Sequence, residues 1–403
     1  MKIRSICLGI DATWPLDGAA VRDAGTFLSR AARRFDEAGI EVQTTRLALS
    51  PFAEAGPRDD ASWVPTYARE LEAACQTSGI QFTSIGPIRW HVVGPEAGRR
   101  FAAALGEALV ATSQVNASIE PVRDGRPSGG AALAAGQIVA QLARETPLGF
   151  GNFRFCTVAQ PSPNNPFFPA AFHGGGPARF TIGLQAADDA RRAFAGAGSL
   201  DELERRLGET LGADVAQVER IARALEGEHG IAYGGTDLTP APFTSDDFSA
   251  AGMLEDLGVA SFGAPGTLAA ASALTQMVKR LPLAHVGYSG LMLPVLEDSL
   301  LARRTAAGLA SVSELLLYSA VCGTGLDTVP LPGDATAEQL AALVLDVTAL
   351  AVALQKPLSC RLFPVPGKRA GDLTEYDSPY LVNTAVMPLH EVSSPRLFER
   401  FGP

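Results

Sequence analysis

The residues of this chain that could do chemistry lie in segments rich in glycine and proline, and one segment combines a thiol with a carboxylate. Residues 321–334 read VCGTGLDTVPLPGD after an apolar helical pattern, which predicts a loop carrying Cys322 and Asp327. Glycine lets a backbone approach a ligand closely, and proline restricts a loop to few conformations. A thiolate at Cys322 would be a nucleophile if a cation or a helix terminus lowered its pKa. A buried, inert cysteine is the alternative interpretation.

A second segment, residues 160–177, is rich in proline and phenylalanine and offers a histidine and an amide. His173 immediately precedes three glycines, so its ring would face a cavity with little crowding. Histidine titrates nearest neutral pH, which makes His173 a candidate general acid or base. A structural histidine bonded to the backbone is the alternative. Asn165, from the same segment, is a candidate substrate contact.

Three further carboxylates follow apolar or glycine-rich stretches. Asp237 ends the run Tyr-Gly-Gly-Thr-Asp and could orient a substrate, although a local Asx turn uses the same residues. Glu297 and Asp298 are adjacent and precede a helical pattern, where the helix dipole alone would favour acidic residues. We assign all three, with Asp327, as candidate acid, base or orienting groups. If they converge, their oxygens would suit Mg²⁺ or Ca²⁺.

Cations that would neutralise an anionic substrate follow the last predicted strand. Arg361 lies near its end, and Lys368 is flanked by proline and glycine, which indicates a held geometry. A solvated charged loop is the alternative interpretation. Together with Thr324 and Asn165, these two side chains are the predicted substrate-binding groups.

Composition limits the partners. The 403 residues carry a net charge of −10 and a pI of about 5.1, and no basic run is interleaved with aromatics, which argues against nucleic acid. Charged residues make up only 19%, so we expect a large core and a symmetric homodimer or larger assembly. The apolar N-terminal run is too short for a signal peptide, and no membrane segment is evident, which predicts a cytoplasmic protein. Five cysteines without a CxxC pair predict reduced thiols.

Strand and helix patterns alternate along the chain. The predicted strands are 3–8, 42–47, 82–88, 153–158, 180–184 and 358–365, and the predicted helices are 63–75, 99–112, 131–144, 200–207, 215–225, 268–281 and 337–354. This alternation is typical of a parallel or mixed sheet covered by helices, either closed as a barrel or doubly wound. In both architectures, ligands bind at the carboxyl ends of the strands.

Several longer motifs together resemble the domain of unknown function 711 family, and the resemblance covers nearly the whole chain. They are Phe155-Cys156, 165–167, 172–174, 235–237, 262–267, 290–298 and 322–334. The resemblance implies a single domain over residues 1–403, built as a ten-stranded α/β barrel of two half-barrels, similar to pyruvate formate-lyase and anaerobic ribonucleotide reductase. By this analogy Cys322 would lie on a loop inside the barrel. The C-terminal run 390–403 lacks the segment that carries a glycyl radical in those enzymes.

These observations predict a non-radical enzyme of the lyase or hydrolase type, acting on a small, polar, anionic metabolite by acid–base or thiolate chemistry. A metabolite-binding or sensor protein without catalysis is the alternative, and a radical enzyme is a third. The first two differ in whether a histidine, a thiol and a carboxylate face one cavity. The sequence specifies no cofactor beyond the divalent cation considered above.

Overall fold

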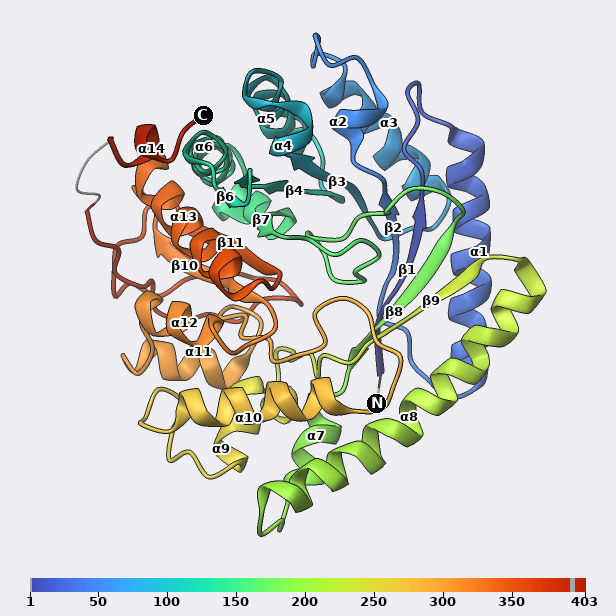
Figure 1. The fold of residues 1–403 in the computed structure, drawn as a ribbon, viewed down its shortest axis with the longest axis vertical. Helices are drawn as coiled ribbons and strands as arrows, with labels where there is room; N and C mark the ends of the chain where they lie inside the picture. The colour runs from blue at the N-terminus through green and yellow to red at the C-terminus, as the bar shows by residue number, and fades with distance from the viewer. Residues whose placement is uncertain (1, 392–395) are drawn as a thin grey trace.

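The computed structural model describes residues 2–391 and 396–403, and it places one large mixed sheet inside a shell of helices (Figure 1). Nine strands form this sheet, in the order β10-β11-β7-β4-β3-β2-β1-β8-β9. Their bounds are β1 Lys2–Ile10, β2 Thr45–Leu49, β3 Phe82–Arg89, β4 Val115–Glu120, β7 Phe155–Ala159, β8 Arg179–Gln185, β9 Ala232–Asp237, β10 Gly325–Pro332 and β11 Leu358–Val365. A separate ribbon pairs β5 (Val122–Arg123) with β6 (Arg126–Pro127).

The helices lie around the outside of the curved sheet, while several long loops run through its interior (Figure 1). The helical bounds are α1 Gly18–Glu37, α2 Phe52–Ala55, α3 Val64–Thr77, α4 Trp90–Val93, α5 Pro95–Val110, α6 Gly129–Glu145, α7 Ala187–Phe194, α8 Leu200–His229, α9 Ala250–Asp256, α10 Thr267–Arg280, α11 Ser299–Ala306, α12 Val312–Ser319, α13 Ala337–Leu354 and α14 Arg396–Arg400, with 3-10 turns η1 Pro147–Arg154 and η2 Asp246–Phe248.

Helical crossovers explain the parallel half of the sheet. Strands β1, β2, β3, β4 and β7 follow one another with α1, α3, α5 and α6 between them, and each neighbouring pair is parallel. A parallel pair needs a long connection, which a helix packed on the sheet supplies. Antiparallel joints then attach β8 to β1 and β11 to β7.

The expected closed, ten-stranded barrel is not formed, because the nine-stranded sheet is open. Between its two edge strands runs the segment 285–294, which makes one isolated bridge to each edge: His285 to Thr236 of β9, and Pro294 to Asp327 of β10. Gly287 and Ser289 have φ values of 67° and 40°, so this segment cannot extend as a tenth strand. Gly287 has no room for a side chain, since a Cβ there would lie 2.2 Å from a carboxylate oxygen of Asp237.

The predicted loop 321–334 is largely a strand, β10, which is a correction to the sequence analysis. Pro330 and Pro332 suggested a loop, but β10 is an edge strand, and an edge strand tolerates residues that cannot donate a ladder hydrogen bond. Two predicted helices, 200–207 and 215–225, are parts of the single 30-residue helix α8. At the start of α8, the Ser199 side chain accepts from the Glu202 backbone N–H and caps the helix.

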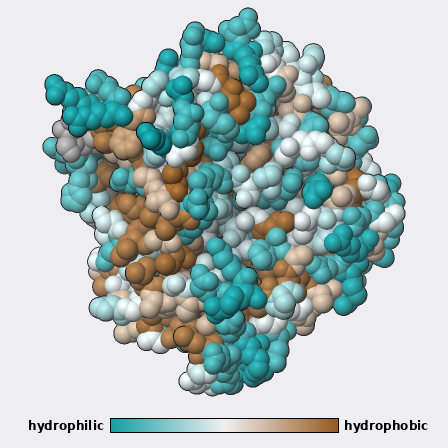
Figure 2. Space-filling model, viewed as in Figure 1, coloured by the Kyte–Doolittle hydropathy of each residue, from teal (hydrophilic) through white to brown (hydrophobic). Residues whose placement is uncertain are grey.

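Hydrophobic residues gather on the surface over the side of the molecule where α10 to α13 lie (Figure 2). Leu309, Leu317 and Leu354 are among the exposed leucines of this region. Among the described helices, only α13 is long and apolar enough to cross a membrane by length and composition, and it packs against α6 and β11 within the fold. The C-terminal run 390–403, which was compared with the glycyl-radical segment, includes residues 392–395, and these four lie outside the described residues.

Candidate functional site

A small cavity lies in the interior of the curved sheet, with side chains from seven strands on its wall. Those strands are β1, β2, β3, β4, β7, β10 and β11, and the loops that run through the interior complete the lining. About 60 Å³ is open to the centres of water molecules. Since one water needs roughly 10–15 Å³ in this measure, the cavity has room for a few waters or one small ionic group.

Charged side chains dominate one part of this wall. Arg4, Arg46 and Arg361 face Glu297 and Asp327, so the lining carries one more positive than negative charge. Glu297 accepts from Arg4 Nη2 at 2.8 Å and from Arg361 Nη2 at 2.5 Å. Arg361 Nε donates to Asp327 Oδ1 at 2.6 Å. All five side chains are buried, which strengthens each of these interactions relative to water.

Local irregularities in two strands occur where charged residues reach the cavity. The β1–β8 register shifts between Ile3 and Ser5, the position of Arg4. The β10–β11 register shifts between Leu326 and Val329, next to Asp327, and Thr328 there has a φ of 43°. A β-bulge re-aims a side chain relative to the regular alternation of a strand. The bulges therefore explain how Arg4 of the inner strand β1 and Asp327 of the edge strand β10 reach the cavity.

Arg46 differs from the other two arginines because it forms no ion pair with a carboxylate among the described residues, although Glu297 is near enough to favour its charge. It is 8% exposed, its Nε donates to Thr44 Oγ1 at 2.9 Å, and no hydrogen bond from its Nη atoms is present among the described residues. Its guanidinium lies 5.2 Å from the Phe168 ring centroid and 5.8 Å from that of Phe82. Burial lowers the pKa of Arg46 to about 10, and repulsion from Arg4 adds to the effect. The group therefore remains a cation at neutral pH on the wall of the cavity.

Neutral polar groups on the same wall are suited to hydrogen bonding rather than nucleophilic attack. The Thr324 hydroxyl is buried without a hydrogen-bond partner among the described residues. The Tyr288 hydroxyl is bonded to Ser359 Oγ, and burial raises the pKa of Tyr288 well above its usual range. Burial likewise raises the pKa of the Cys156 thiol, so that it is protonated at neutral pH despite the nearby Arg361.

Four of the residues predicted from sequence line the cavity: Glu297, Asp327, Arg361 and Thr324. They come from segments that are far apart in the chain, namely β10, β11 and the connections that precede α11 and β10. The remaining predicted residues do not belong to the lining, and each has a local structural role.

Asp237 joins β9 to the segment that carries Tyr288. Its Oδ1 accepts from the Thr239 backbone N–H at 2.9 Å and from Ser289 N–H at 3.0 Å, while Oδ2 accepts from Tyr288 N–H at 2.7 Å. These bonds use the carboxylate for backbone support, so the residue positions Tyr288 without lining the cavity.

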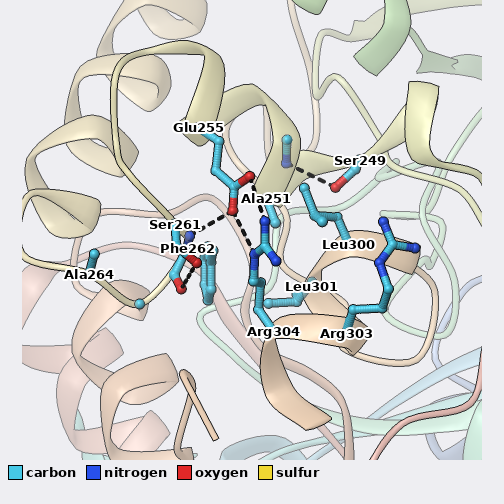
Figure 3. A network of polar contacts seen from close by, with 12 residues as sticks. Ser249, Ala251, Glu255, Ser261, Phe262, Ala264, Leu300, Leu301, Arg303 and Arg304 are labelled. Carbon is cyan, nitrogen blue, oxygen red and sulfur yellow. Dashed lines mark hydrogen bonds and ion pairs between the residues drawn. The ribbon is translucent and has the colours of Figure 1, made fainter. Parts of the chain in front are cut away.

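Asp298 caps two helices at once. Its Oδ1 accepts from Leu301 N–H at 3.0 Å at the start of α11, and its Oδ2 accepts from Ala250 N–H at 2.6 Å at the start of α9. Figure 3 shows the ion pair that joins the same two helices, in which Arg304 Nε donates to Glu255 Oε1 at 2.9 Å. The contacts of Asp298 therefore match the alternative interpretation from the sequence, in which an acidic residue stands at the start of a helix.

His173 lies away from the cavity, near the end of β1. Its Nδ1 is 3.2 Å from Asn164 Oδ1, its Nε2 is 3.2 Å from the Gly176 carbonyl oxygen, and its backbone N–H donates to the Leu49 carbonyl. A Cβ at Gly9 would approach His173 Nδ1 to 2.6 Å, so the ring is packed directly on the strand. The structure therefore does not bring the His173 imidazole to the cavity that Glu297 and Asp327 line.

Cys322, Asn165 and Lys368 also lie outside the lining. The Cys322 sulfur is buried and accepts from Gly325 N–H at 3.3 Å. Asn165 Oδ1 accepts from Phe167 N–H at 2.9 Å, and Lys368 pairs with Glu375 at 2.7 Å. The residues that the structure describes contain no cluster of three or more histidine, cysteine or acidic side chains that could hold a metal ion. The predicted cation site at Asp237, Glu297, Asp298 and Asp327 is accordingly not assembled.

Sequence reasoning missed Arg4 and Arg46, the two cations that strands β1 and β2 contribute. A signal was available, since each is a charged residue inside an otherwise apolar strand pattern. A lone arginine in such a strand is costly to bury unless it is paired or functional.

The fold and this cavity define an α/β protein with a buried, arginine-rich cavity at the centre of a curved mixed sheet. The chain belongs to the family described as uncharacterised ACR (DUF711), whose family model matches residues 1–378. The UPF0210 protein of Desulforudis audaxviator is 31% identical over 390 residues, which cover 91% of this chain and 83% of that protein. The UPF0210 protein of Lactiplantibacillus plantarum is 30% identical, with 100% and 94% of the two chains covered. That of Pyrobaculum aerophilum is also 30% identical, covering 90% and 82%.

Proposed function

We propose that this protein is an enzyme that holds a small metabolite by its carboxylate or phosphate group in the interior cavity and transforms it by acid–base chemistry. The observation that carries the proposal is Arg46, a buried cation that makes no ion pair within the described part of the chain and lies in a cavity of net positive lining. Burying an unpaired guanidinium costs several kcal/mol, and a bound anion would supply the missing charge.

The groups beside Arg46 support acid–base chemistry over thiolate chemistry. Burial raises the pKa of Asp327, with Glu297 adding to the effect and Arg361 opposing it, so Asp327 is the candidate proton carrier. Thr324 and Tyr288 would donate hydrogen bonds to a bound oxygen. The thiol on the wall, Cys156, is held protonated by burial and is a poor nucleophile. A lyase or hydrolase reaction, in which a proton moves near a fixed anionic group, matches this set.

Anion binding is the first test, with inorganic phosphate and acetate as probes in isothermal titration calorimetry. We expect the wild-type protein to bind at least one of them, and Arg46→Met to lose that binding. Lys368→Met is the matched control, because Lys368 also bears a positive charge but lies outside the cavity. Equal affinity in the wild-type and Arg46→Met proteins would refute the assignment of Arg46.

A binding or sensor protein would use the same cavity without turnover. The position of His173 and Cys322 outside the cavity lining favours this second function, whereas the proton carrier Asp327 on the wall favours the enzyme. Asp327→Asn separates the two functions. Asparagine keeps an oxygen that can accept from Arg361 but cannot carry the proton. For an enzyme, this variant retains probe binding and loses conversion of any substrate that the wild-type protein converts. If wild-type protein binds metabolites from a cell extract and mass spectrometry finds none of them converted, the sensor function replaces the enzyme.

A further inference from the structure

We infer that the ligand is an anion with a flat, apolar body, and that this body lies in a second groove beside the cavity. The inference rests on the proposed function, because it assumes that the anionic group binds at Arg46. It adds the substrate class, since the cavity alone holds no more than a carboxylate or phosphate group.

The second groove lies between η1 and the segment 376–380. In the same measure that gives the cavity about 60 Å³, the groove has about 560 Å³, which is within the usual range for ligand pockets. Much of its wall is aromatic, with Phe150 and Phe153 from η1 and Tyr376 and Tyr380 from the facing segment. A planar apolar group would stack on such a surface.

Cavity and groove share part of their walls, so the same side chains border the proposed anion site on one side and the groove on the other. Phe82, Phe153 and Tyr380 line both. Phe153 stacks on Tyr380 with ring centroids 5.9 Å apart, and Phe82 meets Tyr380 edge-on at 6.1 Å. Phe150 stacks on Phe153 at 5.3 Å and extends the row of rings into the groove.

The same row of rings leads to the cations of the cavity. The Arg361 guanidinium lies 5.3 Å from the Phe153 ring centroid, and the Arg46 guanidinium lies 5.8 Å from that of Phe82. An anionic group bound to Arg46 would therefore be one aromatic ring away from the groove. This arrangement fits a ligand with its charge at one end and a stacking body at the other.

Two further features of the groove specify the body of the ligand. Leu148 is 51% exposed at the groove and has a φ of 53°, an uncommon conformation for a bulky residue, so an apolar side chain is held out toward the groove against a backbone cost. Glu145 and Asp377 are exposed on the groove wall, while the cation on that wall, Arg154, is buried and bonded to the Leu109 and Val115 carbonyls. The two exposed carboxylates would repel a second negative charge. The expected ligand therefore has one anionic end only.

The experiment compares matched probes by calorimetry: acetate with phenylacetate and 4-phenylbutanoate, and inorganic phosphate with phenyl phosphate. Burial of a phenyl ring should tighten binding at least about tenfold over the bare head group. Leu148→Asp, at an exposed position, and Phe150→Ala, outside the cavity lining, should each remove most of that gain and leave acetate and phosphate binding unchanged. Terephthalate, with a second carboxylate, should bind more weakly than benzoate.

The outcomes separate this inference from the proposed function. If acetate or phosphate binds through Arg46 but the phenyl compounds bind no more tightly, the groove inference is overturned and the proposed function stands. If the phenyl compounds gain affinity that Leu148→Asp and Phe150→Ala leave intact, the body lies elsewhere and the inference is again overturned. If no probe binds, both proposals fail together. Circular dichroism of both variants shows whether each is folded, and either folded variant suffices for the comparison.

Discussion

Replacing Arg46 by methionine should stabilise the protein while abolishing its binding of anions. Arg46 is a buried cation for which residues 2–391 and 396–403 supply no ion pair, and burial disfavours its charge. A binding site often lowers the stability of the whole protein, because its polar groups have no partner when the ligand is absent. The sign of the change in unfolding free energy therefore tests the assignment independently of any ligand.

The magnitude follows from the environment of the guanidinium. Burial and the nearby Arg4 lower the pKa of Arg46 from 12.5 to about 10, which corresponds to about 3 kcal/mol of unfavourable free energy in the charged state. Against this, methionine loses the bond to Thr44, worth about 1 kcal/mol, and the contacts with the Phe82 and Phe168 rings, worth about 1 kcal/mol together. We expect Arg46→Met to be about 1 kcal/mol more stable than wild type.

Arg154 provides a matched control with the opposite sign. Burial also lowers the pKa of Arg154 to about 10, yet its guanidinium donates to the carbonyls of Leu109 at 2.7 Å and Val115 at 3.0 Å. Arg154→Met relieves a similar cost of about 3 kcal/mol but leaves two buried acceptors unpaired, at about 1–3 kcal/mol each, so it should be about 1 kcal/mol less stable than wild type. Both variants remove one buried cation, so only the bonding of the guanidinium differs between them.

Urea unfolding followed by circular dichroism measures both variants, without phosphate and with saturating phosphate. The slope with denaturant should not change, so that the midpoint reports stability. Phosphate at one hundred times its dissociation constant should add about 2.7 kcal/mol to wild type and nothing to Arg46→Met. If Arg46→Met is destabilised as much as Arg154→Met, Arg46 is a structural residue and the reasoning is refuted.

Three further predictions concern other buried groups. Burial, with Glu54 adding to it, raises the pKa of Glu120 from 4.5 to about 7, so its contribution to stability is present below pH 4.5 and is lost as the pH rises to about 7. In urea unfolding, Glu120→Gln should match wild type at pH 4 and be up to about 3 kcal/mol more stable at pH 8. A difference between the two proteins that does not change with pH would contradict this. Asp298→Ala removes the caps of α9 and α11 together and should lower the free energy of unfolding by about 2–4 kcal/mol. Asp17→Ala, which removes the exposed cap of α1 alone, should lower it by about 1 kcal/mol. Equal losses of stability in thermal unfolding would argue against the double cap. Because burial raises the pKa of Cys156, iodoacetamide at pH 8 should leave this thiol unmodified in the folded protein and alkylate it in urea, as mass spectrometry of the Cys156 peptide would show; rapid alkylation of the folded protein would revive thiolate chemistry.

Local patterns in the sequence were sufficient for much of the secondary structure and for the α/β class. The alternation of apolar strands with helical periodicity predicted β1, β3, β8, β11 and α13, because strand and helix periods are properties of neighbouring residues. The prolines of β10 misled the prediction, since whether a strand lies at an edge depends on its partners and not on its own residues.

The site was predictable only in part, for a related reason. Glu297, Asp327, Arg361 and Thr324 were recognised from their segments and do line the cavity. Asp298 was predicted by the same reasoning, yet its carboxylate caps two helices. Glu297 and Asp298 are adjacent acidic residues, so their sequence could not show which one lines the cavity and which one caps helices.

The sequence by itself determined the residue types, their order, the strand and helix periods and the family. Only the tertiary structure decided which charges meet. It brings Arg4 of β1 and Arg361 of β11 onto one carboxylate, Glu297, and it leaves Arg46 beside them with no ion pair among the residues that it describes. The physical reason is that pairing and burial depend on distances between segments hundreds of residues apart. Periodicity within a segment carries no information about those distances.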